Sequence, residues 1–128
     1  MSALNVLHVE DDESIRALTE LIFSLAADGI VRTAASGEEA LAALESGYKP
    51  DVILLDVMMP GLDGPTVLAL LREMPLHSST PVIFMTARAH ARQRDRLLSL
   101  GAIGVITKPF DPTTLAADIR GYLAGARP

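Results

Sequence analysis

The sequence contains no cysteine and no tryptophan, and its other aromatic residues are two tyrosines and three phenylalanines. Without cysteine the chain forms neither disulfides nor zinc–thiolate sites, a composition compatible with a reducing, cytoplasmic location, which we expect. Few aromatic rings argue against a base-stacking surface for single-stranded nucleic acid. Basic residues are also scarce, 11 against 16 acidic ones, and the resulting net charge of −5 argues against direct binding to DNA phosphates.

Long hydrophobic runs are missing as well. No segment approaches the roughly 18 uninterrupted apolar residues of a membrane span, and the N-terminus lacks the basic and apolar regions of a secretory signal. We therefore expect a soluble protein with no membrane association.

A chain of 128 residues, 49% of them apolar, fits one compact domain. We expect residues 1–128 to form a single domain with no output domain.

Five short apolar runs alternate with segments of helical periodicity. The runs are rich in valine and isoleucine and apolar on both faces, which is typical of strands covered on both sides. Repeated strand-then-helix units predict an α/β fold, a doubly wound five-stranded parallel sheet with helices on both faces. The predicted strands are residues 4–9, 30–34, 52–55, 82–85 and 103–106.

The segments between these runs carry local helix signals. Leucines and isoleucines at spacings of three and four predict the packing face of a first helix, namely Ile15, Leu18, Leu21, Ile22 and Leu25. Ser36 and Glu39 form a capping box at the start of a second helix. Pro65 fits the first turn of a third helix.

Polar side chains follow four of the five runs. Parallel strands bring their carboxyl ends to one edge of the sheet, where ligands bind in such folds. The residues there are Glu10, Asp11 and Asp12 after the first run, Asp56 after the third, Thr86 after the fourth and Lys108 after the fifth. Taken singly, Asp11 and Asp12 would be helix caps, Thr86 a turn residue and Lys108 a solvated side chain. Taken together, the set predicts one polar crevice.

The residue types in this crevice suit phosphoryl chemistry. Two carboxylates about 5 Å apart repel by roughly 3 kcal/mol at an effective dielectric constant near 20, so Asp11, Asp12 and Asp56 need cations beside them. Lys108 offers one, and a hard oxygen-only site suits Mg²⁺. In-line attack by the Asp56 carboxylate on phosphorus would leave the site close to neutral, with Thr86 and Lys108 each bound to a phosphoryl oxygen.

The three histidines need separate interpretation. His8 lies within the first apolar run and is expected to be a packed, hydrogen-bonded core residue. His77 and His90 fall in polar loop or helix-start contexts and are expected to be exposed. None is spaced for a metal site. A phosphohistidine donor would therefore belong to another protein.

The sequence resembles the receiver domain of bacterial two-component response regulators. The resemblance rests on four stretches in the family's order and spacing: Val9-Glu10-Asp11-Asp12-Glu13, Asp56 to Gly64, Thr86-Ala87 and Lys108-Pro109-Phe110. It covers the chain from Leu4 to about Leu123. It implies a flavodoxin-like fold with the sheet order 2-1-3-4-5, and a stand-alone receiver similar to those of chemotaxis.

The resemblance also assigns roles within a phosphorelay. Asp56 would be the phosphoacceptor, Asp11, Asp12, Asp56 and the Met58 backbone carbonyl would hold Mg²⁺, Thr86 would be the switch hydroxyl and Lys108 would pair with the phosphate. The donor would be a histidine kinase or a histidine phosphotransfer protein. A downstream protein partner would bind the surface from the fourth to the fifth helix, and the chain would be a monomer or a weak homodimer. Such a chain is a signalling phosphoacceptor and not a conventional turnover enzyme.

Two positions depart from the family pattern. Val105 stands where many relatives have an aromatic ring that responds to phosphorylation, so the signal would pass through the loop after Thr86 and the fourth helix. That region carries Arg88, Arg92 and Arg96 at spacings of four, which suit an acidic partner or a symmetric dimer. Apolar Met58, two residues after Asp56, predicts slow self-dephosphorylation.

Three other functions use the same fold or a related sheet. A haloacid-dehalogenase-like phosphatase would place a second acid two residues after its nucleophile, where this chain has Met58. A receiver fragment of a hybrid histidine kinase would keep every motif described above. An interaction module that is not phosphorylated would be expected to lack Asp56 or Lys108, and both are present.

Overall fold

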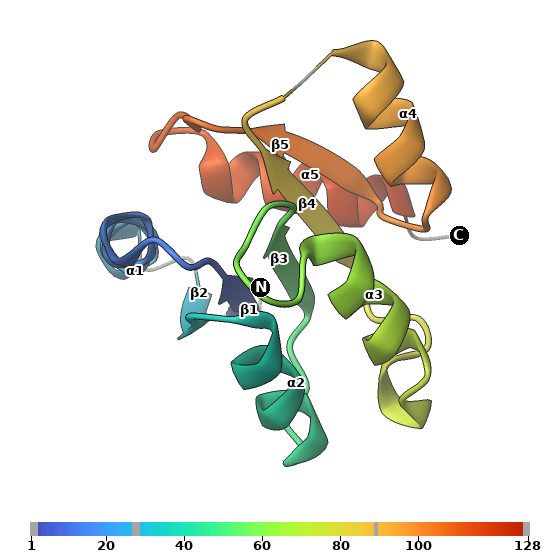
Figure 1. Ribbon diagram of the computed structural model, residues 1–128. Helices are drawn as coiled ribbons and strands as arrows, with labels where there is room; N and C mark the ends of the chain where they lie inside the picture. The colour runs from blue at the N-terminus through green and yellow to red at the C-terminus, as the bar shows by residue number, and fades with distance from the viewer. Residues whose placement is uncertain (1–2, 27–28, 89, 127–128) are drawn as a thin grey trace.

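The computed structural model describes residues 3–26, 29–88 and 90–126 (Figure 1). Five strands alternate with helices in chain order, with one short 3₁₀ turn, η1, before β4. The elements are β1 (Leu4–Val9), α1 (Glu13–Ala26), β2 (Gly29–Ala34), α2 (Gly37–Glu45), β3 (Val52–Asp56), α3 (Gly64–Arg72), η1 (Pro75–His77), β4 (Val82–Thr86), α4 (Ala91–Ser99), β5 (Gly104–Thr107) and α5 (Leu115–Ala126). No helix in the described part of the chain is both long and apolar enough to cross a membrane.

The strands form one parallel sheet in the order β2-β1-β3-β4-β5, which confirms the predicted fold. Every residue of β3 and β4 is buried, as expected for central strands covered on both faces. The ladder includes Asp56, which pairs with Met85, and Thr86, which pairs with Thr107. Because both polar residues belong to paired strands, the sheet itself fixes where their side chains begin.

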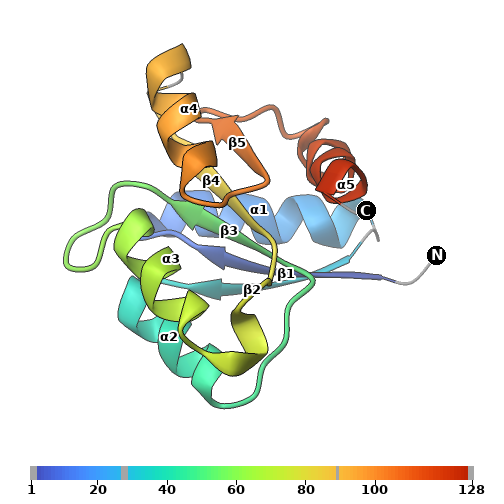
Figure 2. The same cartoon turned by 90° about the vertical axis from the view of Figure 1, so that its right-hand side faces the viewer.

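Helices cover the two faces of the sheet, and each face has its own hydrophobic core (Figure 2). One core joins the strands to α2, α3 and α4 through side chains such as Leu44, Leu68 and Leu97. The other joins them to α1 and α5 through Phe23 and Ile119. The Ser36 hydroxyl accepts a hydrogen bond from the Glu39 amide at the start of α2, which confirms that cap.

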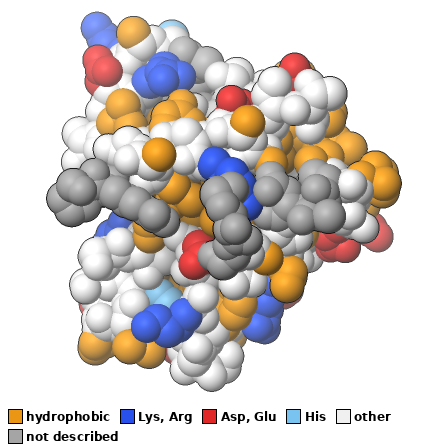
Figure 3. Space-filling model, turned by 180° about the vertical axis from the view of Figure 1, so that it is seen from behind, with side chains coloured by type: hydrophobic (Ala, Val, Ile, Leu, Met, Phe, Trp, Pro, Cys, Tyr) orange, Lys and Arg blue, Asp and Glu red, His pale blue; other side chains and the backbone are white. Residues whose placement is uncertain are grey.

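Helix α1 is rotated relative to the face predicted from its leucines. Thr19 and Phe23 are buried, whereas Leu18, Leu21 and Leu25 are 38%, 53% and 77% exposed. Thr19 tolerates burial because its hydroxyl donates to the Ile15 carbonyl at 3.0 Å within the same helix. Figure 3 shows hydrophobic side chains gathered at the edge of the molecule where α1 lies.

Two of the three histidines differ from expectation. His77 is only 1% exposed, because η1 places its ring beneath the surface, where Nδ1 lies 2.9 Å from the Thr80 hydroxyl. His8 is fully buried as predicted, but neither of its ring nitrogens has a hydrogen-bond partner in the described structure. Burial, with Lys108 and Arg16 nearby, lowers the pKa of His8 to about 4, so the ring is neutral. His90 is exposed, as predicted.

Candidate functional site

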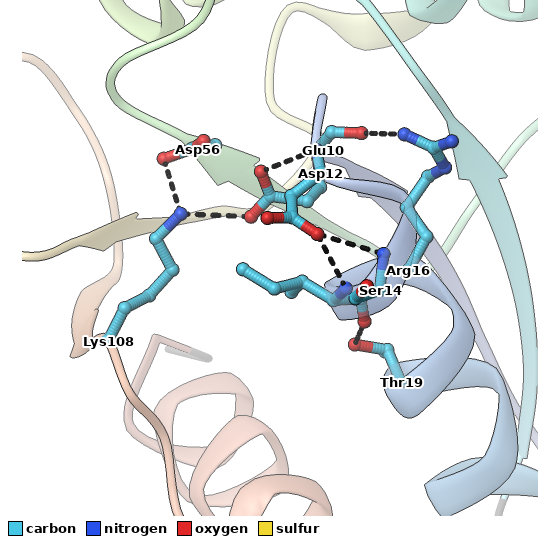
Figure 4. Close-up of polar contacts among 8 residues, drawn as sticks. Glu10, Asp12, Ser14, Arg16, Thr19, Asp56 and Lys108 are labelled. Carbon is cyan, nitrogen blue, oxygen red and sulfur yellow. Dashed lines mark hydrogen bonds and ion pairs between the residues drawn. The ribbon is translucent and has the colours of Figure 1, made fainter.

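Residues far apart in the sequence meet at the carboxyl edge of the sheet (Figure 4). Lys108 follows β5 and its ammonium lies 2.9 Å from Glu10 Oε1 and 3.2 Å from Asp56 Oδ1. Glu10 follows β1 and is 1% exposed, and Asp56 ends β3 and is 3% exposed. The lysine therefore bridges two buried carboxylates that come from neighbouring strands.

A third carboxylate completes an acidic cluster. Oxygen atoms of Glu10, Asp11 and Asp56 all lie within 4.8 Å of one another. Asp11 is exposed and the other two are buried, so the cluster is open to solvent on one side. Three carboxylates against one lysine leave an excess of negative charge, and hard oxygen atoms are the ligands that Mg²⁺ prefers. The residues present fit such an ion.

The structure places Glu10 in this cluster and not Asp12. The Asp12 carboxylate turns away to cap α1, where Oδ1 accepts hydrogen bonds from the amides of Ser14 at 2.8 Å and Ile15 at 3.2 Å. Glu10 extends the strand instead, since its amide donates to the Ala34 carbonyl of β2 at 3.0 Å. The metal ligands predicted from the sequence are the second and third acids of the run. Glu10 directly follows Val9, the last residue of β1, but which acid of the run turns toward Asp56 depends on where the strand ends and the helix begins.

Thr86 lies at the end of β4 and is 3% exposed. Its hydroxyl oxygen accepts a hydrogen bond from the Arg88 amide at 3.0 Å, and its carbonyl accepts one from the Lys108 amide at 2.8 Å. Thr86 is therefore tied both to the segment leading into α4 and to the residue that carries the site's ammonium group. Movement of the hydroxyl would change the first of these contacts.

The loop from β3 to α3 brings the backbone of Gly64 close to the end of β3. The Gly64 amide donates to the Val57 carbonyl at 2.9 Å, and a Cβ atom at Gly64 would lie 2.5 Å from the Asp56 carbonyl oxygen. Only glycine fits this close approach. The Met58 side chain, on the same loop, is 74% exposed.

The three charged side chains, Glu10, Asp56 and Lys108, shift one another's pKa values. Burial and the adjoining Glu10 carboxylate raise the pKa of Asp56 to about 7, against the opposing effect of Lys108. Burial alone would raise the pKa of Glu10, but its hydrogen bonds, chiefly with Lys108, lower it. Burial would lower the pKa of Lys108, and its two carboxylate partners raise it instead. Of the two buried carboxyl groups in the metal-free site, Asp56 is therefore the one that more readily holds a proton near neutral pH.

The fold and the site together define a class. A flavodoxin-like α/β domain with a strand-end aspartate, an acidic cluster and a lysine at its carboxyl edge is the arrangement that the resemblance to receiver domains implies. Residues 6–120 match the family model of the response regulator receiver domain, and the chain belongs to this family.

Similar proteins include regulators and receivers of several kinds. The chain is 44% identical over 121 residues to the transcriptional regulatory protein CseB of Streptomyces coelicolor, covering 93% of this chain and 49% of that protein. The chemotaxis response regulator CheY4 of Vibrio cholerae has a TM-score of 0.85 at 31% identity, with 94% and 99% of the two chains covered. A receiver domain of a signal transduction histidine kinase from Syntrophus aciditrophicus has a TM-score of 0.81 at 31% identity, with 98% and 93% covered. The chain spans about half the length of the curated relatives it matches.

Proposed function

We propose that the chain is a phosphoacceptor switch in a two-component phosphorelay and that Asp56 receives the phosphoryl group. The supporting observation is the placement of Asp56, which is 3% exposed yet lies 3.2 Å from the Lys108 ammonium. A carboxylate oxygen forms the new P–O bond as the P–N bond of a donor phosphohistidine breaks, and the imidazole leaves. The donor is a histidine kinase or a histidine phosphotransfer protein.

The acidic cluster is the proposed Mg²⁺ site. Asp11 and Asp56 are the side-chain ligands, Glu10 replaces Asp12 as the second acid, and the Met58 backbone carbonyl completes the protein ligands that the resemblance implies. Bound Mg²⁺ supplies positive charge that offsets the carboxylates and the incoming phosphoryl oxygens. Lys108 supplies a second cation, 3.2 Å from Asp56 Oδ1.

Thr86 and the segment that follows it carry the output. Its hydroxyl holds the Arg88 amide at 3.0 Å in the unphosphorylated protein and would exchange this contact for a phosphoryl oxygen. The segment after Thr86 leads into α4, where Arg92 and Arg96 are exposed, so the surface from α4 to α5 suits an acidic partner. Val105 is 2% exposed and offers no ring for the readout used by many relatives.

We further propose that this chain, with a net charge of −5, does not itself bind DNA, although the regulators that it resembles act in transcription. We propose a cytoplasmic protein, a monomer or weak homodimer, that is not a conventional turnover enzyme.

The likeness to a histidine-kinase receiver supports a second setting, as the receiver part of a hybrid kinase. The same phosphoacceptor chemistry serves both settings.

Acetyl phosphate with Mg²⁺ tests the function directly. The wild-type chain should gain the mass of one phosphoryl group, and Asp56→Asn should gain none. Asp51→Asn, an exposed position before the same strand, is the matched control and should be labelled like the wild type. Equal labelling of the Asp56→Asn variant would place the acceptor elsewhere. Sustained hydrolysis of an aryl phosphate would favour the phosphatase alternative, which Met58 argues against.

A further inference from the structure

Arg16, in the first turns of α1, reaches back to the acidic segment that precedes the helix. Its Nη1 atom donates a hydrogen bond to the Glu10 backbone carbonyl at 2.7 Å. Figure 4 shows the guanidinium group on the opposite side of Glu10 from Lys108. Glu10 is therefore held by a cation at each end, Lys108 at its carboxylate and Arg16 at its carbonyl.

Asp11 has no comparable anchor of its own. Among the residues that the structure describes, its carboxylate makes no hydrogen bond and no ion pair, and the residue is exposed. An oxygen of Asp11 nevertheless lies within 4.8 Å of oxygens of Glu10 and Asp56. The direction of the Asp11 side chain therefore depends on the backbone from which it projects.

That backbone is fixed by the peptide unit between Glu10 and Asp11. The unit is planar, so holding its oxygen atom restrains the orientation of the plane and, with it, the N–Cα bond of Asp11 from whose Cα atom the side chain branches. Arg16 holds this oxygen, the Glu10 amide is bonded to Ala34 at 3.0 Å, and the Asp12 amide is bonded to Glu10 Oε2 at 3.2 Å. Of these three contacts, Arg16 alone acts on the peptide unit that joins Glu10 to Asp11.

We propose that Arg16 is a positioning residue that, through the Glu10 carbonyl, directs the Asp11 carboxylate toward Asp56 and so sets the affinity of the site for a divalent cation. This inference rests on the proposed Mg²⁺ site. It concerns a residue that contacts neither the ion nor the phosphoryl group.

The direction in which Mg²⁺ affinity changes when Arg16 is removed distinguishes a positioning role of this residue from a purely electrostatic one. A guanidinium group near a cation site repels the cation, so if Arg16 acted only as a charge, its removal would tighten Mg²⁺ binding. Loss of positioning has the opposite effect, because partners that orient metal ligands contribute about 10-fold or more to metal affinity. Arg16→Ala should therefore weaken Mg²⁺ binding despite removing a positive charge.

Mg²⁺ titrations of the full chain by calorimetry provide the test. We expect Arg16→Ala to bind Mg²⁺ about 10-fold more weakly than the wild type. Arg16→Lys, which keeps a positively charged hydrogen-bond donor at this position, should recover part of the loss. Lys49→Ala removes a positive charge from an exposed position before β3 and is the matched control, with wild-type affinity expected. Unchanged or tighter Mg²⁺ binding by Arg16→Ala would overturn the proposal.

A second readout does not require the ion. In metal-free protein, the amide NMR signals of Asp11 and Asp12 should shift in Arg16→Ala, while those of β3 and β4 stay in place. If Arg16→Ala does not fold, Arg16→Gln serves instead, with the same loss expected and the same outcome against the proposal. Failure of the proposed function would be seen separately, as a wild-type chain that is not labelled at Asp56 whatever its Mg²⁺ affinity.

Discussion

The Lys108 ammonium lies 2.9 Å from Glu10 Oε1 although 98 residues separate them in the sequence. The same nitrogen lies 3.2 Å from Asp56 Oδ1, so the lysine links the ends of β1 and β3 from the loop after β5. Glu10 thereby fixes the lysine beside the proposed phosphoacceptor before any phosphoryl group arrives. Preorganised charge of this kind needs little rearrangement during the reaction.

Removing the lysine should destabilise the metal-free protein. Lys108→Met leaves Glu10 and Asp56 buried without their shared cation, and we expect the free energy of unfolding to fall by about 2–3 kcal/mol at neutral pH. Urea denaturation in the presence of a chelator measures this change. The double variant Lys108→Met/Asp56→Asn should recover part of the loss, because one of the two buried charges is then absent. If the two substitutions change the free energy of unfolding additively, the stabilising interaction between Lys108 and Asp56 is contradicted.

The two acids that flank Asp11 should differ sharply in their effect on metal binding. Glu10→Gln removes a charge from the cluster, and we expect Mg²⁺ affinity to fall by about 10-fold. Asp12→Asn keeps a capping side chain on α1 and should change the affinity less than about twofold. Calorimetric titration of both variants with Mg²⁺ shows whether Glu10 or Asp12 contributes to the metal site. A larger loss in Asp12→Asn would restore the assignment made from the sequence alone.

Asp56→Asn should stabilise the metal-free chain at alkaline pH. The pKa of Asp56 is raised from 3.8 to about 7, so the folded protein binds a proton more tightly than the unfolded chain, and the charged carboxylate costs stability above pH 7. We expect the Asp56→Asn variant to gain about 1–3 kcal/mol at pH 8, after allowing for its lost contact with Lys108. The gain should shrink as the pH falls from 7 toward 4. Urea denaturation of both proteins across this range, in a chelator, measures it, and a gain that grows on acidification would contradict the raised pKa.

His8 should make the fold sensitive to acid. Its pKa falls from 6.5 to about 4 on folding, so the unfolded chain binds a proton more readily, and stability is lost as the pH falls from 6.5 to 4. The loss attributable to His8 should approach about 3 kcal/mol at pH 4. His8→Val should flatten this part of the stability profile. The comparison is best made in the Asp56→Asn background, because Asp56 contributes with the opposite sign over an overlapping range.

Local patterns predicted most of the architecture. Runs of valine and isoleucine located all five strands to within one residue at either end, because a strand covered on both faces must be apolar throughout. The strand order came from the resemblance and agrees with the structure. Asp56 and Thr86 directly follow apolar runs and Lys108 comes two residues after one, and the parallel sheet places all three at the same edge.

Three features of the structure depend on the direction in which side chains point, and the pattern of residue types does not specify that direction. Which acid of the Glu10-Asp11-Asp12 run points inward is set by where β1 ends and α1 begins, and a shift of one residue sends the side chain elsewhere. The leucines of α1 indicated one face, but the helix presents Thr19 and Phe23 to the sheet, since a threonine that bonds within its own helix can be buried. His77 was expected to be exposed, yet η1 turns its ring inward beside Thr80.

Periodicity and strand-end chemistry were enough to specify an α/β sheet with a charged edge, because both arise from neighbours along the chain. Packing alone settled which carboxylate Lys108 meets and how Arg16 holds the backbone beside it, since these contacts join separate elements whose mutual rotation no single segment encodes.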